Sequence, residues 1–186
     1  MSNQSLPILE SERLILAPIN LGDLEDCVTM DAQPEVREFF GSGDDGVFDK
    51  ESHRQFLRER IPRDYGEGLG FWSIRQKSAR DRFCGWIVLI ELAYEGPEIE
   101  IGWRLPVECW GKGLATDGAR LVLEHGFHTL NLEEIIAVIH PGNVRSFAVA
   151  ERLGMQDAGR RQAYGMELSC LRLSHTGFEM QRNEHV

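Results

Sequence analysis

The chain has 186 residues, of which 42% are hydrophobic and 27% charged, and its formal net charge is −10. This length favours one domain with a substantial core, and the composition is typical of a soluble globular protein rather than a disordered one. The excess of acidic groups argues against nucleic acid as the main partner, because phosphate binding requires a basic surface. A cationic partner such as an amine is compatible with this charge.

Residues 1–5 are polar and uncharged, without the basic start and apolar run of a signal peptide. The longest apolar run, residues 86–90, is far too short to cross a bilayer. The four cysteines lie far apart and form no Cys-x-x-Cys pair, which predicts reduced thiols and neither disulfides nor a zinc site. We therefore expect a cytoplasmic protein with no membrane partner.

The N-terminal half of the chain predicts one strand, two helices and then three strands. A first strand is expected over residues 13–19, and Asp23 can cap a helix that runs to about residue 32. Residues 41–49 form a polar loop rich in glycine and aspartate, and a second helix over 50–61 ends before Pro62. Three further strands are expected at residues 70–75, 83–92 and 98–105.

The C-terminal half predicts a long helix over 112–130, a β-branched strand over 134–139, a helix over 145–153 and a late strand over 168–173. Gly154 lies where a left-handed helix cap is expected. Gly102, inside the strand at 98–105, suggests a bulge or a close backbone approach. The mixed order of elements predicts an α/β or α+β fold with a mixed sheet.

Two glycines, Gly111 and Gly113, lie between a predicted strand and the long helix. At such a turn, backbone N–H groups can face a ligand at the helix N-terminus, where the helix dipole favours phosphate oxygens. The segment is neither a Walker loop nor a Rossmann fingerprint, because the Gly-Lys-Ser/Thr ending and the third glycine are missing. Taken alone, it is equally compatible with a tight strand-to-helix turn.

Several motifs in order resemble the core of the GNAT N-acetyltransferases: EIGWRL at 100–105, WGKGLAT at 110–116, NVRS at 143–146 and ERLGM at 151–155. The opening ERLIL at 12–16 resembles the RimJ/RimL-like branch, which contains the ribosomal-protein alanine acetyltransferases. The resemblance covers about residues 10–180. It implies a single GNAT domain over residues 1–186, with a mixed central sheet that is splayed at a bulge and flanked by helices.

The resemblance also implies acetyl-CoA as co-substrate. Its pyrophosphate is expected on the backbone N–H groups of Gly111, Lys112, Gly113, Leu114, Ala115 and Thr116. Its pantetheine arm is expected to pair like an added strand with the backbone at Trp103, Leu105 and Val107, and Asn143 is a helix cap that also touches this arm. A backbone N–H near Gly102 could then polarise the thioester carbonyl.

Glu100 is the candidate general base, because an ammonium group must lose a proton before it attacks a thioester. We expect Glu100→Gln to lower turnover most severely at low pH. Many family members carry a tyrosine acid where this chain has Ala150, so Ser146 is the substitute candidate for protonating the leaving thiolate. Both residues also have structural interpretations, an ion pair for Glu100 and a backbone hydrogen bond for Ser146.

Four other side chains are candidates for chemistry. His140, near a strand end, is an alternative acid or base, and an acetylated Cys109 is an alternative to direct transfer. His125 and His128 lie one helical turn apart, but no third ligand is apparent in the sequence. The pair therefore predicts a structural or surface role and no metal site.

These residues predict direct acetyl transfer from acetyl-CoA to a primary amine, and a protein N-terminus is one candidate acceptor. The alternatives are a small amine such as a polyamine or aminoglycoside, a non-catalytic acetyl-CoA-binding module, and a structural domain without a ligand. The acceptor pocket is expected from the first helices, the 41–49 loop and the C-terminal strands. The predicted partner is the amine acceptor, and the chain is expected to be a monomer or a homodimer.

Overall fold

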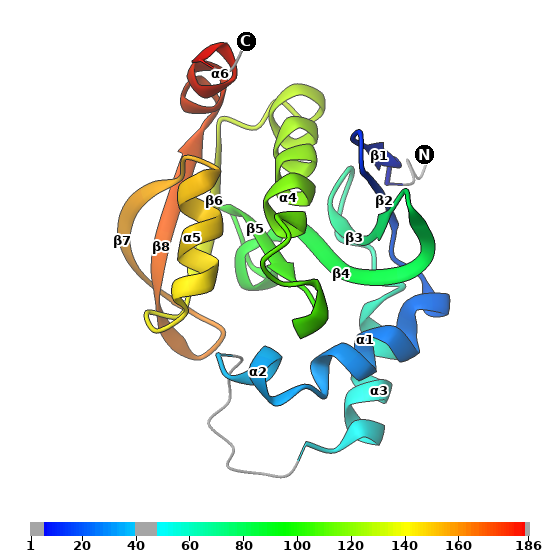
Figure 1. The fold of residues 1–186 in the computed structure, drawn as a ribbon. Coiled ribbons are helices and arrows are strands. Elements are labelled where there is room, and N and C mark those ends of the chain that lie inside the picture. The colour runs from blue at the N-terminus through cyan, green and yellow to red at the C-terminus, as the bar shows by residue number, and fades with distance from the viewer. Residues whose placement is uncertain (1–5, 40–47, 185–186) are drawn as a thin grey trace.

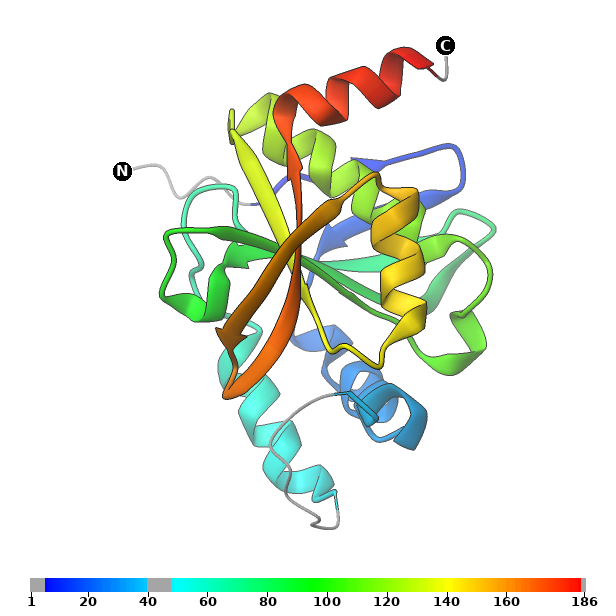
Figure 2. The ribbon, with the colours of Figure 1, turned by 90° about the vertical axis from the view of Figure 1, so that its left-hand side faces the viewer.

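The architecture is a mixed β-sheet with helices on both faces (Figure 1 and Figure 2). The computed structural model describes residues 6–39 and 48–184. In this part of the chain the sheet order is β1-β2-β3-β4-β5-β6-β8-β7, and β5 with β6 is the parallel pair. The strands are β1 (Leu9–Glu10), β2 (Leu14–Pro18), β3 (Gly70–Gln76), β4 (Ala79–Glu91), β5 (Ile99–Arg104), β6 (Glu134–Ile139), β7 (Gln156–Ala163) and β8 (Met166–Ser174).

Strand β4 is buried on both sides, which explains its dense apolar sequence. Ile87 and Leu89 pack in the cluster that contains α4, whereas Trp86 and Val88 pack in the cluster that contains α1 and α3. Because successive side chains of a strand point to opposite faces, α4 covers one face of the sheet and α1 with α3 covers the other. The helices are α1 (Leu24–Asp31), α2 (Pro34–Arg37), α3 (Lys50–Arg60), α4 (Leu114–Glu124), α5 (Val144–Arg152) and α6 (His175–Glu184).

The predicted α/β class with a mixed sheet is confirmed. The expected strands at 13–19, 70–75, 83–92, 98–105, 134–139 and 168–173 correspond to β2, β3, β4, β5, β6 and β8. The helix expected over 112–130 is α4 followed by a π-helical turn at His125–Thr129. Gly154 has a φ of 74°, the left-handed conformation expected after α5. Residues 41–47 of the predicted loop lie outside the described residues.

The sequence patterns do not predict β1, β7, α2 or α6. In β7 only Ala163 is buried, so this edge strand has no apolar alternation to detect and is held by its register with β8. Asp23 occupies the N-cap position of α1 as predicted, but its side chain makes no capping hydrogen bond to the helix. Asn20 caps the turn that leads into α1, and Asp23 accepts a hydrogen bond from Arg75 Nη2 at 2.7 Å.

The parallel pair of β5 and β6 positions the site. β5 keeps an unbroken register with β4 along its whole length, so the bulge predicted at Gly102 is absent from this pairing. On its other side, β5 is paired with β6 only at Glu100 and Ile136. Among the described residues, the β6-facing backbone edge at 102–104 therefore has no strand partner. The sheet opens there because two strands diverge.

No helix among residues 6–39 and 48–184 has both the length and the apolar character that crossing a bilayer requires.

Candidate functional site

A cavity of about 620 Å³ lies between the loop that precedes α4 and the start of α5, a size typical of small-molecule sites. The structure brings most of the predicted cofactor residues to its wall: Trp103, Leu105, Gly111, Gly113, Leu114, Ala115, Thr116 and Asn143. Lys112 and Val107 are not among the lining residues described. Lys112 Nζ donates to Glu108 O at 2.6 Å, and the Val107 N–H donates to Gln33 Oε1 at 2.8 Å.

The loop before α4 is built on two glycines in the left-handed region. Gly111 has a φ of 69°, and Gly113, the N-cap of α4, has a φ of 76°. Arg13 holds this loop, because its Nη2 donates to Lys112 O at 2.9 Å and its Nε donates to Asp117 Oδ2 at 2.6 Å. The first N–H groups of α4 have no helical acceptor. They therefore form, with the helix dipole, an anion-binding end on the cavity wall.

Three arginines that the sequence motifs contain, but do not single out, line the same cavity: Arg104, Arg145 and Arg152. Arg145 Cζ lies 4.3 Å from the centre of the Trp110 ring, and Trp110 Nε1 donates to Leu105 O at 2.7 Å. Arg152 comes from the last turn of α5. The cavity thus combines helix-end donors with three cationic side chains, although the chain as a whole is strongly acidic. Its lining also includes two carboxylates, Glu35 and Asp117, and Asp117 is paired with Arg13. This local charge suits a phosphate-bearing ligand.

A second cavity of about 350 Å³ adjoins the first and contains Glu100. The two cavities share Phe39, Trp103, Arg104, Asn143 and Ser146. Asn143 caps α5 as predicted, with its Oδ1 accepting from the Ser146 N–H at 3.1 Å. The two predicted catalytic residues therefore line one connected space, with Ser146 at the junction and Glu100 on the far side.

Glu100 is 8% exposed, and its Oε2 accepts a hydrogen bond from the Tyr164 hydroxyl. Burial raises the pKa of Glu100 to about 7, while the Tyr164 hydrogen bond and the positive charge of Arg60 oppose this rise. A carboxylate whose pKa lies near neutral pH is well matched to accepting a proton from an ammonium group of a substrate.

Tyr164 is the residue of this site that sequence reasoning misses. It lies with Gly165 in the two-residue turn between β7 and β8, where φ is 53° and 74°, as in a type I′ hairpin. Its hydroxyl oxygen also accepts from the Ala93 N–H at 3.3 Å. Burial and then the negative charge of Glu100 raise the pKa of Tyr164, so its hydroxyl stays protonated. In the sequence, the Tyr164-Gly165 pair is a possible sign of a hairpin turn. This sign can be used only when both flanking strands are predicted, and β7 is not.

Asp31 joins the N-terminal helices to β5 beside the second cavity. Its buried carboxylate lies 3.0 Å from Arg104 Nη1 and 2.9 Å from His53 Nε2. The net effect of these partners is to hold the pKa of Asp31 below its usual value in spite of burial. This contact ties α1, α3 and β5 together, and Arg60 at the end of α3 lines the second cavity.

The remaining candidates are placed as follows. Ala150 is fully buried and carries no group that could donate a proton. Cys109 is 1% exposed, and burial raises the pKa of its thiol to about 12, which disfavours the thiolate that an acetylated intermediate requires. His140 lines the second cavity, and its Nδ1 accepts from the Gly142 N–H at 3.1 Å.

Comparison with known proteins agrees with this geometry. The family model described as "Acetyltransferase (GNAT) domain" matches residues 13–156. The chain therefore belongs to the GNAT acetyltransferase family, and it is an N-acetyltransferase.

Three relatives illustrate the range of similar proteins. The chain is 29% identical to "Uncharacterized N-acetyltransferase YoaA" of Bacillus subtilis over 85% of this chain and 88% of that protein. It is 34% identical to "Putative ribosomal N-acetyltransferase YdaF" of the same organism, but over only 41% and 42% of the two chains. The fold matches that of a spermidine N-acetyltransferase from Vibrio cholerae, solved in complex with CoA and spermine, with a TM-score of 0.70, 16% identity and coverage of 91% and 99%.

We expect Gly113→Val to weaken acetyl-CoA binding by about tenfold or more, since it displaces loop N–H groups that each contribute about 1 kcal/mol. The new Cβ would lie 3.1 Å from Arg13 Nη2 at a φ of 76°. Titration calorimetry measures the change. Gly159→Val is the matched control, because Gly159 also has a positive φ (87°) but borders open space away from the cavity. Equal affinities in both variants would contradict this placement.

Glu100→Gln should lower turnover by about 10²–10⁴-fold above neutral pH, because the variant cannot accept a proton. With a pKa of about 7, wild-type Glu100 is itself protonated at low pH, so the difference between the two enzymes narrows there. This reverses the sequence-based expectation of the greatest loss at low pH. Initial rates from pH 5.5 to 9 test it, and a constant ratio of the two rates across this range would exclude Glu100 as the base.

Tyr164→Phe should move the acidic limb of the rate profile to higher pH. The Tyr164 hydrogen bond lowers the pKa of Glu100, so its loss raises that pKa, and more alkaline solution is needed to generate the base. Tyr94→Phe is the control, since its ring packs edge-on against Tyr164 at 6.4 Å but no hydrogen bond from its hydroxyl to Glu100 is found among the described residues. A profile that shifts equally in both variants would contradict a specific role for Tyr164.

Proposed function

We propose that this enzyme transfers the acetyl group of acetyl-CoA directly to the primary amine of a peptide or protein N-terminus. The observation that carries the proposal is the buried Glu100, whose pKa is raised to about 7 and which lines a cavity that adjoins an anion-binding one. The ERLIL motif at 12–16, which resembles the RimJ/RimL-like branch, supports an N-terminal acceptor.

In this proposal, residues of the first cavity bind acetyl-CoA, and residues of the second cavity carry out proton transfer. Acetyl-CoA supplies the acetyl group as a reactive thioester. The N–H groups at the start of α4, with Arg145 and Arg152, bind its phosphates, and the open backbone edge of β5 pairs with its pantetheine arm. Glu100 accepts the proton of the acceptor ammonium, directly or through a water, and Tyr164 orients its carboxylate. Ser146, at the junction, protonates the leaving thiolate.

The charges around the second cavity favour an N-terminal amine over a polyamine. Among the described lining residues, Glu100 is the single carboxylate, and it is used as the base. Arg60 also lines this cavity, with its guanidinium 4.9 Å from the Phe71 ring and 5.3 Å from the Tyr94 ring. This cation would repel the additional ammonium groups of a polyamine and can donate to the first carbonyl of a peptide.

The proposed setting is a single domain in the cytoplasm. The four cysteines are all buried and unpaired, as expected where thiols stay reduced. One hydrophobic core cluster contains residues of β2 and β4 together with residues of α4, β6 and β8, which supports one folding unit.

A panel of acceptors tests the reaction class. Release of free CoA thiol would be followed with short peptides bearing free N-termini, with spermidine and with an aminoglycoside. We expect turnover with peptides and little with spermidine. Binding of acetyl-CoA without thiol release from any amine would favour the non-catalytic alternative, and preference for spermidine would favour the polyamine one.

Arg60→Glu tests the charge argument directly. Replacing the cation with a carboxylate should raise the spermidine-to-peptide ratio of kcat/KM by about tenfold, as expected for a charge reversal at a partly desolvated position. Arg58→Glu is the matched control, because Arg58 lies on the same helix, is exposed and makes the same charge change. If both substitutions change the ratio equally, Arg60 does not select the acceptor.

A further inference from the structure

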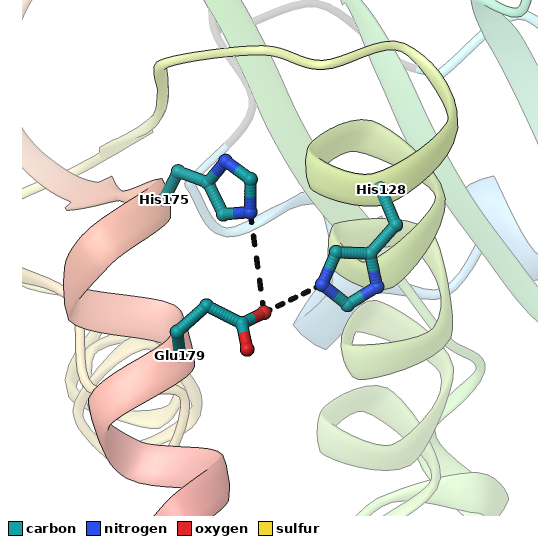
Figure 3. Close-up of side chains that lie close together, drawn as sticks. All are labelled: His128, His175 and Glu179. Atoms are coloured by element: carbon teal, nitrogen blue, oxygen red, sulfur yellow. Dashed lines mark hydrogen bonds and ion pairs between the residues drawn. The ribbon is translucent and has the colours of Figure 1, made fainter.

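Three side chains that can ligate a metal converge at the end of α4 that is opposite the glycine loop (Figure 3). His128 lies in the π-helical turn His125–Thr129, and His175 and Glu179 lie one turn apart on α6. One ligand atom from each side chain lies within 4.8 Å of the other two. The sequence hides this cluster, because His128 and Glu179 are separated by 51 positions.

The distances within the cluster fit a small cation after minor side-chain rotation. His128 Nε2 is 2.5 Å and His175 Nε2 is 4.0 Å from the same oxygen, Glu179 Oε1. Ligand atoms around tetrahedral zinc, with bonds of about 2.0–2.2 Å, are about 3.3 Å apart. The two observed distances lie on either side of this value. All three side chains are between 37% and 41% exposed, so a cation can reach them from solvent.

Buried aromatic rings restrict both imidazoles. His175 stacks on Phe127 at 5.4 Å with an interplanar angle of 14°, and His128 meets Phe178 edge-on at 5.8 Å. Both phenylalanines are buried. Side chains that are held in place lose less entropy when they bind a ligand, which favours metal binding over that by freely rotating surface histidines.

His125, the partner that spacing alone suggests for His128, does not belong to the cluster. It is buried, and its Nε2 lies 2.9 Å from Gly68 O, on a different side of the turn. His125 therefore has the structural role expected from the sequence. The two other candidate metal ligands, His175 and Glu179, come from α6, which the sequence patterns do not predict.

A cation already lies beside these atoms. Arg182 Nη1 is 3.3 Å from His128 Nε2 and 3.6 Å from Glu179 Oε1. The guanidinium would compete with a metal for the same lone pairs, but its side chain is 48% exposed and can turn into solvent. The cluster thus already has a positive charge next to it. Substitution of Arg182 can show whether the same atoms also bind a metal cation.

We propose that His128, His175 and Glu179 form a binding site for a divalent transition-metal cation, best matched by Zn²⁺, that fastens α6 to the end of α4. Two imidazoles and one carboxylate leave a fourth position for water. Mg²⁺ and Ca²⁺ do not fit, because they prefer sets of oxygen ligands. The 11 residues of α4, a helix about 16 Å long, lie between the glycine loop and the site, so the metal acts on the fold and not on acetyl transfer.

Titration of the chelator-treated, tag-free protein with ZnCl₂ tests the proposal, with MgCl₂ as the parallel probe. We expect one Zn²⁺ per chain, a higher thermal midpoint with Zn²⁺ than without it, and no response to Mg²⁺. His175→Ala and Glu179→Gln should each weaken Zn²⁺ binding by about tenfold or more, which is typical for the loss of one ligand from a small site. Circular dichroism verifies that both variants are folded.

Arg182→Ala is the opposing control. If the cluster is a metal site, removal of the competing guanidinium leaves Zn²⁺ binding unchanged or makes it tighter. If the cluster is only an ion-pair network, wild type shows no Zn²⁺ binding, and the proposal is overturned. Zn²⁺ binding that is unaltered in His175→Ala and Glu179→Gln would place the metal elsewhere, for example on the cysteines, and would overturn it equally.

Discussion

The structure depends on the divergence of β5 and β6. These two strands are paired only at Glu100 and Ile136, and their parallel register does not continue beyond that point. A parallel pair that closed fully would satisfy its own backbone and leave no room for a ligand. The early separation leaves the edge at 102–104 open, and both cavities lie along it. The site is therefore a consequence of sheet topology before it is a matter of particular side chains.

The same divergence determines the chemistry of Glu100. This residue lies at the last paired position, where it is far enough inside the sheet to be desolvated and still borders the second cavity. Desolvation favours the neutral carboxyl group, while Tyr164 and Arg60 favour the carboxylate. The balance gives a pKa of about 7. A fully exposed glutamate would be ionised at neutral pH but would be a weaker base.

The two cavities are lined by positively charged side chains, although the chain as a whole is acidic. The chain carries a net charge of −10, yet arginines line both cavities. Arg145 and Arg152 border the first, Arg60 borders the second, and Arg104 borders both and contacts Asp31. Aromatic rings lie beside several of these guanidinium groups. Planar stacking of this kind helps to hold a charge at a chosen position, beside the acids that pair with Arg104 and Arg145, which are Asp31 and Glu38. Net charge alone thus indicates little about the ligand of an individual cavity.

Local features of this protein were determined by the sequence itself. The Asn143 cap, the left-handed Gly154, the glycine turn before α4 and the apolar strands each depend on residues within a few positions of one another, so short patterns reveal them. Motif order also singled out Glu100, Ser146 and most of the loop predicted to bind the cofactor, and these residues lie on the walls of two adjoining cavities.

The tertiary structure alone decided the features that require distant segments to meet. The contact of Tyr164 with Glu100 spans 64 positions, and that of His128 with Glu179 spans 51. The opening at β5 comes from a strand pairing that ends early, and not from the Gly102 bulge that the local sequence suggested. Strand β7, which presents Tyr164, has no apolar periodicity because almost all of it faces solvent. Its position is imposed by hydrogen bonding to β8, which no local pattern encodes.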